Sequence, residues 1–157
     1  MKHEEVALDK FYVVGISVRT TNQNHQSQGG DIAKLWEIFF RNGYLQQMLA
    51  NKVSDDIFCI YTDYESDYTG KYTTIIGYKV SGIEGIPTNL SLTIKEIPES
   101  KYYKYISEGE LPYAVGKTWA HIWQSNIDRH YAADFDVYGA ESRDPKNTKI
   151  TTFLSIK

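Results

Sequence analysis

A repeated order of predicted elements constrains this chain of 157 residues more than any other feature. Each half predicts a strand, a helix and two further strands, over residues of about 8–83 and 90–157. The helices share the similar segments KLWEIF and KTWAHIW, and the strands that follow share IYTDYES and DVYGAES. A shift of about 77 positions places Tyr61 on Tyr138 and Cys59 on Asp136. The sequence therefore predicts an internal duplication within a single domain of residues 1–157.

In the first half, apolar residues alternate in the strands and recur at helical spacing in the helix. The strands are predicted at residues 11–20, 55–64 and 71–80. The last two form a hairpin around the polar turn ESDYTG. A helix is predicted from Asp31, as its N-cap, to about Asn42, and a further helical turn in the segment YLQQML.

The second half repeats this pattern, with two predicted strands before its helix. Strands are predicted at residues 90–98, 101–109, 131–139 and 148–157. A helix is predicted from Leu111 to about Asp128, with Pro112 in its first turn. Together the halves predict an α+β fold, with one antiparallel sheet of about eight strands and two main helices on one face. A ligand cleft is expected between the halves.

The segment ADFDVY places two acids and a tyrosine on one face of a strand. Side chains alternate between the faces of a strand, so Asp134, Asp136 and Tyr138 share one face, and Phe135 and Val137 share the other. An acidic face is either exposed to solvent or directed into a site. The predicted duplication favours a site, because it brings the equivalent strand alongside.

The equivalent strand adds Cys59 and Tyr61 to the same face. Tyr61 and Tyr138 offer hydroxyl groups to a buried carboxylate, and their rings suit an organic cation. Cys59 is also predicted as a ligand-site residue, although an isolated cysteine on a strand is typically a small buried hydrophobe.

Composition excludes several classes of protein. The net charge of −3, with dispersed Lys and Arg, gives no footprint for direct binding of nucleic acid. A single cysteine and four scattered histidines predict neither a disulfide nor a metal site. No signal peptide and no apolar run of about 18 residues is found, so we expect a cytoplasmic chain outside the membrane. Tyrosine is abundant, at 13 residues, which suits a wet surface lined by rings.

Several segments together resemble the effector-binding domains of the GyrI-like superfamily, in particular integron-cassette effector-binding proteins and the C-terminal domains of AraC-type regulators. The resemblance covers nearly the whole chain and is most specific in YTDYESDYTGKYT and ADFDVYG. It implies a fold similar to drug-sensing domains that bind lipophilic cations between two halves. Nothing before Phe11 is long enough for a helix-turn-helix module, so it implies a stand-alone sensor, with a separate regulator protein as an open alternative.

The resemblance also suggests which residues bind the ligand. Asp136 matches the position at which the family usually has a glutamate that balances a cationic ligand, and its side chain is one methylene shorter. Asp134 is the second acidic candidate. Trp123 is expected to reach the edge of the cleft, whereas Trp36 and Trp119 are either core residues or ligand contacts.

The predicted function is the binding of lipophilic organic cations or flat aromatic compounds, within transcription regulation. No cofactor is indicated, and no phosphate-binding glycine loop or nucleophile elbow indicates an enzyme. Two alternatives stay open. Asp136 and Tyr138 are suited to acid-base chemistry in a hydrolase of reactive compounds, as in some relatives. The same aromatic groove also suits an adaptor that holds a peptide or a protein.

Overall fold

The computed structural model describes residues 1–25, 30–41, 50–86 and 91–157. Its strands are β1 (Glu4–Leu8), β2 (Phe11–Thr21), β3 (Ile57–Thr62), β4 (Lys71–Val80), β5 (Thr93–Ile97), β6 (Ser100–Gly109), β7 (Ala133–Tyr138) and β8 (Thr148–Ile156). Its helices are α1 (Asp31–Arg41) and α3 (Tyr113–Gln124), with short 3-10 turns η1 (Asn22–His25) and η2 (Ala140–Ser142). The predicted turn YLQQML and the predicted end of the first helix lie outside the described residues.

The eight strands form one antiparallel sheet in the order β1-β6-β8-β7-β3-β4-β2-β5. This order has a twofold pattern. If β1 exchanges places with β5, β2 with β6, β3 with β7 and β4 with β8, the same order is obtained from the opposite edge of the sheet. The predicted α+β fold with a duplicated unit is thus confirmed. The two halves meet at the pair β3 and β7, in the centre of the sheet.

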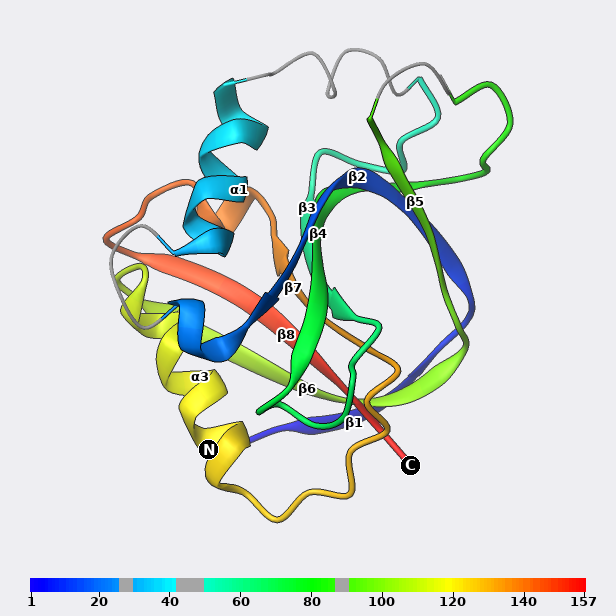
Figure 1. Ribbon diagram of the computed structural model, residues 1–157. Coiled ribbons are helices and arrows are strands. Elements are labelled where there is room, and N and C mark those ends of the chain that lie inside the picture. Colours follow the sequence, from blue (N-terminus) through cyan, green and yellow to red (C-terminus); the bar gives the residue numbers. More distant parts are fainter. Residues whose placement is uncertain (26–29, 42–49, 87–90) are drawn as a thin grey trace.

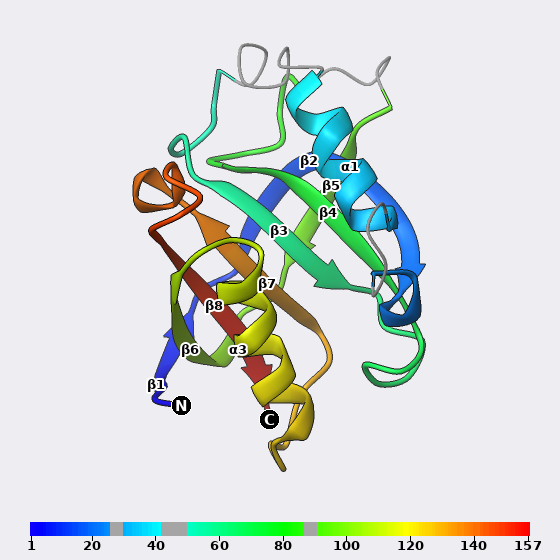
Figure 2. The ribbon, with the colours of Figure 1, turned by 90° about the vertical axis from the view of Figure 1, so that its left-hand side faces the viewer.

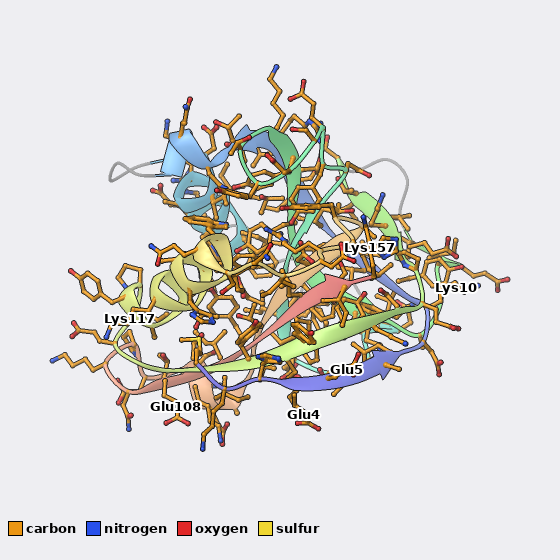
Figure 3. The ribbon with its side chains drawn as sticks, turned by 90° about the horizontal axis from the view of Figure 1, so that it is seen from below. Glu4, Glu5, Lys10, Glu108, Lys117 and Lys157 are labelled. Atoms are coloured by element: carbon orange, nitrogen blue, oxygen red, sulfur yellow. The ribbon has the colours of Figure 1, made fainter. Side chains whose placement is uncertain are left out.

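The first half has one more strand than the sequence predicted, β1, whereas β5 and β6 of the second half are the strands predicted at residues 90–98 and 101–109. β1 pairs with β6, and β5 pairs with β2, so the first strand of each half completes the sheet of the other half. β1 is short and exposed at the sheet edge, where Glu4 and Glu5 lie (Figure 3), and it has too few apolar residues to give a strand signal. The unit is therefore strand, strand, helix, strand, strand.

Both helices cover the same face of the sheet (Figures 1 and 2). α1 packs on β2 and β4, and α3 packs on β6 and β8. β3 and β7 lie between the two helices (Figure 2), and Trp36 of α1 and Trp119 of α3 contact Tyr138 and Asp136 of β7. Trp36 of α1 and Trp119 of α3 therefore lie on one side of the sheet, which confirms the predicted placement of the helices.

The other face of the sheet carries its own apolar core. Phe135 of β7 contacts Phe11 of β2 and Tyr102 of β6, at ring-centroid distances of 5.4 Å in both cases. These three strands are not neighbours in the sheet, so the sheet curls around this core. Gly15 and Gly77 allow β2 and β4 to approach closely in the first half. A Cβ at either residue would lie 2.1 Å from a backbone oxygen of the partner strand.

α3 is shorter than predicted. It ends at Gln124, because Ser125 is extended, its N–H donates to the carbonyl of Ile122, and its hydroxyl donates to the carbonyl of His121 at 2.6 Å. Asn126 and Asp128, expected in the helix, belong to the connection to β7. This early end lets Arg129 turn back toward the sheet, where it forms a β-bridge with Ile156.

Candidate ligand-binding site

The centre of the site is the pair of strands β3 and β7. Their register places Cys59 opposite Asp136, Tyr61 opposite Asp134, and Ile57 opposite Tyr138. Strand alternation turns Asp134, Asp136 and Tyr138 to the face that the helices cover. Phe135 packs into the core of the other face.

Asp136 is completely buried and accepts hydrogen bonds from three side chains. Tyr61 donates its hydroxyl at 2.8 Å, Thr152 of β8 donates at 2.5 Å, and Trp119 Nε1 lies 3.2 Å from both carboxylate oxygens. Burial raises the pKa of Asp136 from 3.8 to about 6, although these three hydrogen bonds act to lower it. The carboxylate is thus held charged near neutral pH in an apolar region.

Asp134 forms a separate ion pair. Its carboxylate lies 2.9 Å from Arg129 Nη2 and also accepts the Tyr64 hydroxyl at 2.5 Å. Its other oxygen accepts the backbone N–H and the hydroxyl of Ser155, at 2.7 Å and 2.9 Å. The guanidinium and this carboxylate balance each other, so Asp136 is the buried charge without an ionic partner among the described residues.

A cavity of about 390 Å³ lies between the helices, above β3, β4 and β7. Eight aromatic side chains line it: Trp36, Tyr61, Tyr64, Tyr68, Tyr72, Trp119, Trp123 and Tyr138. Apolar residues of both helices and of the segment before α3 complete the wall, including Ile32, Leu111, Pro112 and Val115. The predicted cleft between the halves therefore exists, and it is aromatic.

The predicted site residues divide into two groups. Trp36, Trp119, Trp123, Tyr61 and Tyr138 line the cavity. The buried residues Cys59, Asp134 and Asp136 are not part of the lining.

Asp136 lies behind rings that do line the cavity. Two of its hydrogen-bond donors, Tyr61 and Trp119, face the cavity, and their rings meet edge to face with centroids 5.2 Å apart. The Asp136 charge therefore acts on the cavity across this pair of rings. On the side of α1, Trp36 and Tyr138 form a similar pair, with centroids 4.9 Å apart.

Cys59 is a buried thiol beneath the cavity. Its Sγ lies 3.4 Å from the Tyr61 hydroxyl, and burial, followed by the charge of Asp136, raises the pKa of the thiol. It has no contact with the cavity surface, as expected for a small buried hydrophobe.

Sequence reasoning did not find Tyr64, Tyr68, Tyr72 and Arg129. The sequence predicts a polar turn at ESDYTG, yet Tyr68 of this turn stacks on Trp123 with centroids 5.9 Å apart. The tyrosines at positions 61, 64, 68 and 72 gave a signal, because so dense a group of rings needs a common surface. Arg129 gave no such signal, because its position depends on contacts with β7 and Tyr131.

Comparison with known proteins identifies the class to which this fold and cavity belong. Residues 6–156 match the family model described as integron-associated effector binding protein. The chain belongs to this family of effector binding proteins.

Individual proteins of known structure share this fold over nearly the full chain. The integron cassette protein VCH_CASS2 of Vibrio cholerae has a similar structure, with a TM-score of 0.76, 24% identity, and coverage of 99% of this chain and 95% of that one. The structure of SAV2435 bound to tetraphenylphosphonium has a TM-score of 0.77 and 20% identity, over 100% of this chain and 94% of that one.

A relative with a regulatory name is similar in sequence. YobU of Bacillus subtilis (strain 168), named as a candidate transcriptional regulator protein, is 24% identical over 153 residues, which are 96% of this chain and 94% of YobU.

Two further features of the described residues bear on function. None of their helices is long and apolar enough to cross a membrane. Nor do three or more His, Cys, Asp or Glu side chains among them lie close enough together to hold a metal ion.

Proposed function

We propose that this chain binds lipophilic organic cations, and flat aromatic cations in particular, in the cavity between α1 and α3. The observation that carries the proposal is the position of Asp136, a buried carboxylate with no ionic partner among the residues that the structure describes, directly behind the rings of Tyr61 and Trp119. Aromatic rings attract cations through their negative faces, by about 0.5–2 kcal/mol per contact. A carboxylate behind the rings adds to this attraction, because little water separates it from the cavity.

The charge balance around the cavity supports the same ligand class. Arg129 and Asp134 balance each other, so the ionised Asp136 leaves the surroundings of the cavity with a net negative charge. A bound organic cation would offset the free energy of burying this charge. SAV2435, which has the same fold, is bound to tetraphenylphosphonium, and that cation is therefore a suitable first probe.

Binding without turnover is part of the proposal. Asp136 accepts three hydrogen bonds and is not part of the cavity lining, so a substrate in the cavity has no direct access to its oxygens. A general base must come within hydrogen-bond distance of the proton it removes, or act through one water. The function proposed is therefore effector sensing, and the similarity to YobU supports a place for it within transcription regulation.

Isothermal titration calorimetry with tetraphenylphosphonium tests the proposal. We expect saturable binding by the wild type. Trp123→Ala, which removes a cavity ring from α3, should weaken it about tenfold. Tyr113→Ala is the matched control, because Tyr113 is on the same helix, is 67% exposed and does not line the cavity. Absence of binding, or an equal effect of both variants, would contradict the cavity as the site.

Turnover is measured separately. Activated aryl esters are incubated with the wild type and with Asp136→Asn, and the released product is counted per molecule of protein. We expect no release above that of buffer. Many turnovers that depend on Asp136 would establish the hydrolase alternative instead.

A further inference from the structure

Arg129 is the one charged side chain among the described residues that line the cavity. It follows α3, and the residue is only 6% exposed, so its guanidinium is a buried group in the cavity wall. A cavity that binds only a simple organic cation does not need the positive guanidinium of Arg129 in its wall. The surroundings of Arg129 show what this group is suited to bind.

Two of the three guanidinium nitrogens of Arg129 are buried donors. Its Nη2 donates to Asp134, but within the part of the chain that the structure describes, Nε and Nη1 have no hydrogen-bond partner. Buried polar groups in folded proteins nearly always have a partner, and an unpaired donor lowers stability. Asp134 cannot supply the missing acceptor, because its oxygens already accept from Tyr64, Ser155 and Arg129 itself.

The guanidinium is also held in a fixed orientation. The ring of Tyr131 covers one face, with the guanidinium carbon 4.2 Å from the ring centroid, and the rings of Tyr64 and Trp119 lie at 5.9 Å. Because N–H groups lie in the guanidinium plane, stacking on one face leaves the donors at its edges unpaired, and Nε and Nη1 are buried within the cavity wall. A preformed donor set of this kind in a cavity wall is suited to an oxygen acceptor on a ligand.

We propose that the ligand of this cavity carries an acceptor oxygen, as a carbonyl or a carboxylate, in addition to its aromatic cationic part, and that Arg129 binds this oxygen. The inference rests on the proposed function for the cationic part. Trp119 lies between the two charged groups, because its Nε1 contacts Asp136 and its ring lies beside Arg129. The cation is held by the rings backed by Asp136, and the acceptor by the free N–H groups of Arg129. Asp134 neutralises the guanidinium, so an uncharged carbonyl is sufficient.

Three dyes that share one cationic ring system test this assignment. Tetramethylrosamine has no acceptor group, tetramethylrhodamine methyl ester adds a carbonyl, and tetramethylrhodamine adds a carboxylate. Affinities are measured by fluorescence anisotropy at pH 8. We expect the dyes with the added carbonyl or carboxylate to bind the wild type about tenfold tighter than tetramethylrosamine.

Arg129→Lys identifies the group responsible. Lysine keeps a positive charge for Asp134 and lacks the planar donor edge, so the tenfold preference should fall to about onefold to threefold, while the affinity for tetramethylrosamine changes little. A merely structural role of Arg129 would weaken all three dyes alike. If this variant does not fold, the preference of the wild type decides alone.

The outcomes separate the two proposals. Equal binding of all three dyes by the wild type would overturn the role of Arg129 and leave the cation site intact. If the wild type binds none of the dyes and does not bind tetraphenylphosphonium, the proposed function fails, and this inference fails with it.

Discussion

Cys59 and Asp136 face each other across the pair of strands at the centre of the sheet, and the Tyr61 hydroxyl lies between them, 3.4 Å from Cys59 Sγ and 2.8 Å from the carboxylate. The twofold pattern of the sheet makes the two residues equivalent, yet only the second half carries an acid. The charge behind the cavity therefore belongs to one half of a duplicated fold.

The affinity for organic cations should depend on pH through Asp136. A bound cation favours the charged carboxylate, so affinity is full above the pKa of about 6 and falls as the pH drops below it. Tyr61 and Cys59 stay protonated throughout, because burial raises their pKa values. We expect binding of tetraphenylphosphonium to be about tenfold weaker at pH 5 than at pH 8, by calorimetry. A constant affinity over this range would show that Asp136 does not act on the ligand.

Tyr61→Phe should shift this pH dependence. The variant keeps the ring and removes a hydrogen bond that lowers the pKa of Asp136, so the pKa should rise by about one unit. The midpoint of the binding curve against pH should rise with it. Tyr138→Phe is the matched control, because Tyr138 also lines the cavity and no hydrogen bond from it to Asp136 occurs in the described part of the chain. Equal shifts in both variants would contradict this role of Tyr61.

The free energy of unfolding should also depend on pH through Asp136, but it should fall as the pH rises, whereas the affinity for cations increases. Because the pKa of Asp136 is higher in the folded chain, protonation of this residue stabilises the fold, and the gain is lost as the pH rises through about 6. Relative to Asp136→Asn, the wild type should gain about 2 kcal/mol between pH 7.5 and pH 4.5, by urea denaturation without ligand. A difference that is constant, or that grows with rising pH, would contradict the raised pKa.

The burial of Cys59 predicts slow alkylation. Its thiol is inaccessible and its pKa is raised, so iodoacetamide at pH 8 should modify the native chain only as fast as the chain unfolds. Mass spectrometry follows the reaction, and 6 M urea should accelerate it by more than about a hundredfold. Rapid alkylation without denaturant would place Cys59 at the cavity surface instead.

The sequence was sufficient for the central strands of this fold but not for its edges. Both central strands could be predicted because they have strong alternating patterns, and the sheet places Cys59 opposite Asp136, the residue with which the shift matched it. β1 escaped prediction, since a short edge strand is stabilised by its partner β6 more than by its own residues.

The candidate site could be predicted only in part for the same reason. Rings on helices and strands follow from periodicity, so Trp36, Trp119, Tyr61 and Tyr138 could be expected near a cleft. That Asp136 would lie behind these rings, and that Arg129 would reach back to Asp134, depends on packing between distant segments. Local patterns carry no information on such contacts.

The central claim, that the charge of Asp136 selects cations in the aromatic cavity, is tested most directly with a matched pair of ligands. 10-Methylacridinium is cationic, and acridine has nearly the same shape and is neutral at pH 8. Calorimetric titration of the wild type, of Asp136→Asn and of the exposed control Asp128→Asn gives the affinities of both ligands. We expect Asp136→Asn to weaken 10-methylacridinium about tenfold and acridine by less than about twofold, with Asp128→Asn unchanged. An affinity for 10-methylacridinium that is the same in Asp136→Asn and the wild type would contradict the account.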